Sequence, residues 1–170
     1  MIKFRSALLG GLCGSIAVVV LAGIFALFVK FVPTLSKISA RAELTPITWW
    51  SRLGLAAMAV CGGVIIALLY ALVFEFVTRR AGWLIGAAIG VMHATLVWLG
   101  AGLAAWWFPD FMSAFAGELS LLFHSLLAIA AFLALHVVYG AIVGAMYGPP
   151  NHAATTTLSV VRPTLPRDTP

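Results

Sequence analysis

The chain has 170 residues, of which 63% are hydrophobic and only 9% are charged, and its mean hydropathy is +1.10. Water-soluble domains carry charge on about a quarter of their residues, so this composition excludes a soluble globular domain and indicates an integral membrane protein. The net charge of +5 is modest and lies in loops and chain ends. This pattern favours contact with lipid headgroups over binding of nucleic acid.

Four apolar runs are each long enough to cross a bilayer as a helix, which takes about 20 residues. The predicted spans are residues 6–29, 53–77, 82–108 and 119–148. The first run is longer than the apolar part of a signal peptide, so we expect it to remain as a helix. The predicted fold is all-α: a polytopic membrane protein built as a four-transmembrane-helix bundle, with one domain over residues 1–148.

The segments between the spans differ in length and composition. Only residues 78–81 join the second and third spans, which predicts an antiparallel hairpin. The linker over residues 30–52 can form either a short interfacial helix or an irregular loop. Residues 149–170 are rich in Pro and Thr and predict a disordered tail.

The positions of lysine and arginine indicate the orientation in the membrane. With four spans, both chain ends lie on the same side as the short 78–81 loop, which carries Arg79 and Arg80. The linker on the other side is also basic, but a short loop with two arginines is hard to translocate. We therefore expect both ends in the cytoplasm and the protein in the inner membrane.

Glycines recur every four positions at one end of the third and fourth spans. They are Gly82, Gly86 and Gly90 in the third span, and Gly140, Gly144 and Gly148 in the fourth. Helices in lipid associate through small residues that let their backbones approach closely. Because the two sets lie at matching depths, we predict that these helices pack along the six glycines as a glycine zipper.

The next step along each glycine stripe reaches a histidine, His93 in the third span and His136 in the fourth. At 1.5 Å per residue both lie about 16–18 Å from the cytoplasmic end, near the centre of a hydrocarbon core of about 30 Å. Ionisable residues at this depth are candidates for function. We therefore expect a polar site near the bilayer midplane that contains His93, His136, Tyr70 and Tyr139.

Three interpretations of this site remain open. The favoured one is a hydrogen-bonded clasp between helices, in which the histidines pair with Tyr70, Tyr139, Thr95 or Ser15, and it implies no cofactor. The second is ligation of haem or a transition metal by His93 and His136, and the third is a path for protons or a substrate. The lone thiols Cys13 and Cys61 lack the close spacing of a zinc site or a redox pair.

Other polar residues have simpler expected roles. Glu75 precedes Arg79 by four residues, which favours an ion pair at the end of the second helix. His124 is expected to form an interfacial hydrogen bond. The sequence contains neither G-x-S-x-G nor H-E-x-x-H nor a paired-aspartate motif for intramembrane hydrolysis, so no catalytic residue is assigned and a non-enzymatic role is expected.

Three segments carry a resemblance to known proteins: HVVYGAIVGAMYG at 136–148, YALVF at 70–74 and GAAIGVMH at 86–93. Through them, residues 55–148 resemble a group of small bacterial four-helix membrane proteins of unassigned activity. The resemblance implies a four-span inner-membrane fold and no activity or cofactor.

The sequence as a whole predicts a small non-enzymatic accessory or structural component of the inner membrane. Its expected partners are the lipid bilayer and either further copies of the chain or another protein of a membrane complex. The alternatives are a haem- or metal-binding redox subunit that uses His93 and His136, and an oligomeric small channel or carrier.

Overall fold

The computed structural model describes residues 2–31, 49–108 and 126–149, and these residues form an all-α fold. The helices are α1 (Phe4–Phe31), α3 (Trp49–Leu72), the π-helical segment η1 (Val73–Thr78), α4 (Trp83–Trp107) and α7 (Leu126–Tyr147). Four helices are long and apolar enough to cross a membrane, so the predicted fold class is confirmed. The linker, His124, the start of the predicted fourth span and the tail beyond 149 lie outside the described residues.

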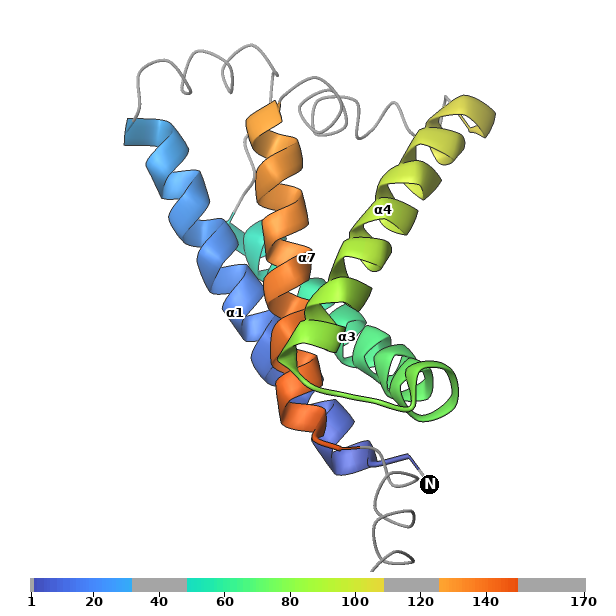
Figure 1. The fold of residues 1–170 in the computed structure, drawn as a ribbon. Coiled ribbons are helices and arrows are strands. Elements are labelled where there is room, and N and C mark those ends of the chain that lie inside the picture. The colour runs from blue at the N-terminus through green and yellow to red at the C-terminus, as the bar shows by residue number, and fades with distance from the viewer. Residues whose placement is uncertain (1, 32–48, 109–125, 150–170) are drawn as a thin grey trace, which may run out of the picture.

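The order of the helices along the chain differs from the order in which they pack. α7 packs against both α1 and α4, and α3 packs mainly against α1 (Figure 1). α4 follows α3 after a short connection, yet its main partner is α7 rather than α3. Toward Trp107, α4 leans away from α1 and α7, so these helices lie closer together where α4 begins than where it ends (Figure 1).

The connection between α3 and α4 reverses the chain within a few residues. The π-helical segment leads into Arg79, which has the left-handed backbone angles φ 50° and ψ 21°. The Thr78 hydroxyl donates a hydrogen bond to the Arg80 carbonyl oxygen at 2.7 Å. A left-handed residue after the last turn is a common way to end a helix, and here it directs the chain into α4.

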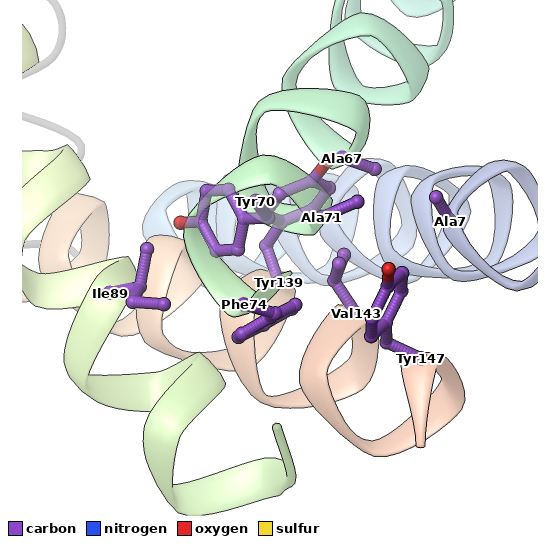
Figure 2. Packing of buried hydrophobic residues seen from close by; sticks show 9 residues of the cluster. All are labelled: Ala7, Ala67, Tyr70, Ala71, Phe74, Ile89, Tyr139, Val143 and Tyr147. Carbon is purple, nitrogen blue, oxygen red and sulfur yellow. The ribbon is translucent and has the colours of Figure 1, made fainter. Parts of the chain in front are cut away.

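The buried core lies where the four helices approach most closely. It consists of Ala7, Ala67, Tyr70, Ala71, Phe74, Ile89, Tyr139, Val143 and Tyr147 (Figure 2). Aromatic rings fill the space between alanines and glycines, which is typical of helices that associate in lipid. Only 17–22% of the most apolar window of each span is buried, so most of the helical surface is left to contact the bilayer.

Candidate functional site

The backbones of α4 and α7 touch at a series of glycines. A Cβ atom built on Gly144 would lie 2.9 Å from the Cα of Gly86, and one built on Gly140 would lie 3.1 Å from the Cα of Gly90. Cβ atoms at Gly86 and Gly90 would in turn overlap the carbonyl oxygens of Gly140 and His136. No residue larger than glycine fits these four positions without moving a helix, and this contact fixes α4 relative to α7.

Two of the six predicted packing glycines also have unusual backbone angles. Gly82 and Gly148 lie just outside α4 and α7, and their φ angles are 139° and 68°. A Cβ atom built on either would meet no atom within 4 Å. The positive φ at these helix ends favours glycine whatever the space around it. Gly82 also belongs to the α4–α7 contact through its backbone, because a Cβ atom built on Gly144 would overlap the Gly82 carbonyl oxygen.

The contact between α4 and α7 brings the predicted polar residues together. The rings of His93 and His136 meet edge to face, with their centroids 4.9 Å apart. The Tyr70 hydroxyl from α3 lies 3.3 Å from Nδ1 of His93, and the rings of Tyr70 and Tyr139 are 5.7 Å apart. We call Tyr70, His93, His136 and Tyr139 the histidine–tyrosine cluster; it joins α3, α4 and α7 near the middle of α4 and α7.

Most of the hydrogen-bond donors in and beside this cluster donate to backbone carbonyl oxygens. Nδ1–H of His136 donates to the carbonyl of Phe132 at 2.8 Å, and the Tyr139 hydroxyl donates to the carbonyl of Gly63 in α3. The Ser15 hydroxyl in α1, which is 3% exposed, donates to Gly11 at 2.6 Å. The side chain of Thr95 is exposed and donates to Val91 in its own helix, so it lies apart from the cluster.

A cavity of about 240 Å³ adjoins the cluster. Its polar lining residues are Ser15, His93, His136 and Tyr139, and the rest of the lining is glycine, alanine and branched aliphatic residues. Among the residues that the structure describes, no aspartate, glutamate, lysine or arginine lines it. The arrangement therefore offers hydrogen bonds to a neutral group and no counter-charge to an ion.

A second polar group lies between the start of α1, η1 and the end of α7, and the sequence did not predict it. Glu75 in η1 is 2% exposed, and its Oε1 accepts a hydrogen bond from the Tyr147 hydroxyl at 2.8 Å. The backbone N–H of Lys3 donates to the same hydroxyl at 3.2 Å, and the Lys3 ammonium group donates to the Pro149 carbonyl. We call Lys3, Glu75 and Tyr147 the carboxyl cluster.

The burial of Glu75 differs from the expected ion pair at the helix surface. Arg79 is exposed and ends η1 in a left-handed conformation, so the α-helical spacing of four residues does not apply between them. A signal for the burial was present in the sequence, because Ala59, Gly63, Ala67 and Ala71 recur every four residues and the next step is Glu75. Tyr139, Val143 and Tyr147 have the same spacing in α7.

The positions of the histidines and cysteines determine whether a metal ion or haem fits this site. In the described parts of the chain, no group of three or more His, Cys, Asp or Glu side chains is placed to hold a metal ion. The thiols of Cys13 and Cys61 are exposed. A haem with two histidine ligands needs the imidazoles on opposite faces of the macrocycle, whereas the rings of His93 and His136 touch each other.

Comparisons with protein-family models, curated proteins and solved structures found no match for this chain. Its four candidate spans nevertheless establish the class. It is an integral membrane protein. The resemblance drawn from the three short segments identifies no family, and the four-span architecture is what the structure supports.

Proposed function

We propose that this protein is a non-enzymatic accessory or structural component of the bacterial inner membrane, in which the polar groups of the bundle hold the helices in place. The observation that carries the proposal is the position of Tyr139. Its hydroxyl group donates to Gly63 of α3, and its ring lies 2.9 Å from where a Cβ atom of Gly14 in α1 would be. One side chain of α7 thus connects three helices.

The hydrogen bonds of the cluster support a structural role over catalysis. A serine nucleophile is activated by a base that accepts its proton, but the hydrogen of Ser15 is directed at the carbonyl of Gly11 in its own helix. The hydrogens of Tyr139 and His136 are likewise directed at carbonyl oxygens. Polar side chains that are satisfied in this way stabilise helix contacts in lipid.

The exposed surface supports a role beside other membrane components. Large hydrophobic side chains are exposed along all four helices, and they include Ile24, Ile65, Leu96 and Leu126. Lipid tails cover such a surface, and so does the helix of another copy or of a different membrane protein. The proposed partners are therefore the bilayer and a second membrane-spanning chain.

The charges at one end of the bundle support an orientation with both chain ends in the cytoplasm. Arg5, Arg79 and Arg80 are exposed. Arg79 and Arg80 line a pocket together with Pro149, which follows α7, and α1 begins at the same end of the bundle (Figure 1). Basic residues near short loops favour the cytoplasmic side. A phosphatase reporter that is active only in the periplasm should remain inactive when fused after Pro170; activity of that fusion overturns the orientation.

The structural role is separated from the redox alternative by one experiment on purified protein. We expect the oxidised and dithionite-reduced absorption spectra to show no Soret band, and metal analysis to find no stoichiometric metal. We also expect the double variant His93→Leu/His136→Leu to unfold at a lower temperature than the wild type. A Soret band or bound metal that disappears in a stably folded double variant establishes the metal- or haem-binding alternative and refutes the proposal.

A further inference from the structure

The protonation of the two histidines follows from their hydrogen bonds. Nδ1 of His136 faces a carbonyl oxygen, which only accepts, so this nitrogen carries the hydrogen and Nε2 keeps a lone pair. Tyr70 is 3% exposed and its hydroxyl faces Nδ1 of His93. A phenol in an apolar core donates its hydrogen where it can, so Tyr70 donates and His93 carries its hydrogen on Nε2.

The two touching rings therefore have complementary Nε2 atoms. Nε2 of His93 is a hydrogen-bond donor and Nε2 of His136 is an acceptor, and both residues line the cavity. A hydroxyl group donates and accepts through a single oxygen atom, whereas an ammonium group only donates and a carboxylate only accepts. The pair is thus suited to a hydroxyl group.

The remainder of the cavity restricts the body of the ligand. The described residues of its lining include no charged side chain, and a charged ligand at this depth would be costly without one. The volume of about 240 Å³ exceeds what a single water molecule needs. Aliphatic residues such as Val18, Ile66 and Leu135 form the walls beside the polar residues, which suits a small apolar body.

We propose that this cavity binds a neutral alcohol or phenol from the lipid phase, with the hydroxyl group bridging Nε2 of His93 and Nε2 of His136. The site goes beyond the structural role proposed above and does not depend on it. The apolar body of the ligand lies against the aliphatic walls, between α1, α3 and α7.

The first test uses two probes, a phenol and its methyl ether, of which only the phenol has a hydroxyl hydrogen to donate. 4-Fluorophenol and 4-fluoroanisole are titrated into detergent-solubilised wild-type protein and into empty micelles, and binding is followed by ¹⁹F NMR. We expect a saturable shift for the phenol beyond that in micelles, and affinity for the ether weaker by about fivefold or more, the value of one hydrogen bond. Equal behaviour of the two probes, or a phenol shift no larger than in micelles, overturns the proposal.

A pair of variants locates the binding. Gly62 lines the cavity, and Gly54 lies on the same helix away from it; a Cβ atom built on either meets nothing within 4 Å. Gly62→Leu should therefore fold, occupy part of the cavity and abolish the phenol shift, while Gly54→Leu should leave it unchanged. Loss of binding in both variants, or in neither, refutes this location.

The histidine resonances provide the last check on the bridge. In protein labelled with ¹⁵N at histidine, the phenol should shift the Nε2 signals of both His93 and His136, and the ether should shift the acceptor signal of His136 far less. If only water exchanges at these nitrogens and the phenol leaves them unmoved, the cavity is a hydration site and the proposal is wrong.

Discussion

Each of the two polar clusters of this bundle includes a residue of α7 and a residue of α3 or of η1, its π-helical extension. The clusters differ in what surrounds them. In the carboxyl cluster, Glu75 is 2% exposed and Tyr147 is 1% exposed. In the histidine–tyrosine cluster, both histidines are partly exposed and line a cavity. Polar groups that are enclosed must be hydrogen-bonded within the protein, whereas polar groups beside a cavity have donor and acceptor atoms that a ligand can reach.

An apolar segment separates the two clusters. Phe74 is fully buried between them, with its ring centroid 5.3 Å from that of Tyr147 and 6.2 Å from that of Tyr70 (Figure 2). Val143 is also fully buried in this core. An aromatic ring therefore lies between Tyr70 of one cluster and Tyr147 of the other. The carboxyl cluster closes the end of the bundle, and the histidine–tyrosine cluster provides the site.

The largest expected effect tests the close contact that brings both clusters into place. In Gly144→Leu, the new side chain must displace the backbone of Gly82 and Gly86. Overpacking costs about 1–3 kcal/mol, and we expect the upper end of this range because the displaced atoms are backbone. The neighbouring Ala145 is exposed, so Ala145→Leu is the matched control. SDS titration followed by tryptophan fluorescence should show a much lower midpoint for the glycine variant alone; similar midpoints would mean that α4 and α7 do not pack through this glycine.

The next prediction removes a tyrosine hydroxyl group from each cluster, beginning with the carboxyl cluster. Tyr147→Phe takes a donor from Glu75 and an acceptor from the backbone of Lys3, and loss of a hydrogen bond to a buried carboxyl group costs about 1.5–3 kcal/mol. The same SDS titration measures the loss. Exchange of both partners for apolar residues, in Glu75→Met/Tyr147→Phe, should recover part of it, because the carboxyl group that lost its donor is then absent. A double variant less stable than Tyr147→Phe would show that Glu75 stabilises the fold through other contacts.

The sequence predicted the architecture and the composition of the histidine–tyrosine cluster, because both depend on regular helices. Hydropathy alone indicates four spans, and a helix places residues four apart on one face. The spacing from the glycine stripes to His93 and His136 is a matter of counting along two such helices. In the structure, the ring centroids of these two histidines are 4.9 Å apart.

Features that depend on irregular backbone were beyond such counting. The π-helical segment over Val73–Thr78 and the left-handed Arg79 interrupt the regular α-helical spacing between Glu75 and Arg79. Gly82 and Gly148 continue the glycine stripes by number, but they lie just before α4 and just after α7, and helical spacing does not predict their positive φ angles. The cavity was also missed, since it results from how four helices diverge rather than from any one of them.

A smaller effect is expected when the same atom is removed from the cluster that lines the cavity. Tyr139→Phe removes the hydrogen bond to Gly63, which should cost about 0.5–1.5 kcal/mol, the net value of one neutral hydrogen bond. The ring still fills the space above Gly14. In SDS titration this variant should lose less stability than Tyr147→Phe. A larger loss would show that the histidine–tyrosine cluster contributes more to stability than the carboxyl cluster.

The smallest effect concerns the hydroxyl group that the sequence assigned to the clasp and the structure places outside it. The Thr95 side chain is exposed and donates only to Val91, one turn earlier in α4. Thr95→Val keeps the shape and the branching at Cβ, and substitutions away from buried networks change stability by about 0.5 kcal/mol or less. The SDS midpoint and the phenol-induced ¹⁹F shift should both match the wild type. A drop in stability as large as that of Tyr139→Phe would mean that Thr95 has an interhelical partner in the membrane, and the boundary of the histidine–tyrosine cluster would then extend along α4 beyond His93.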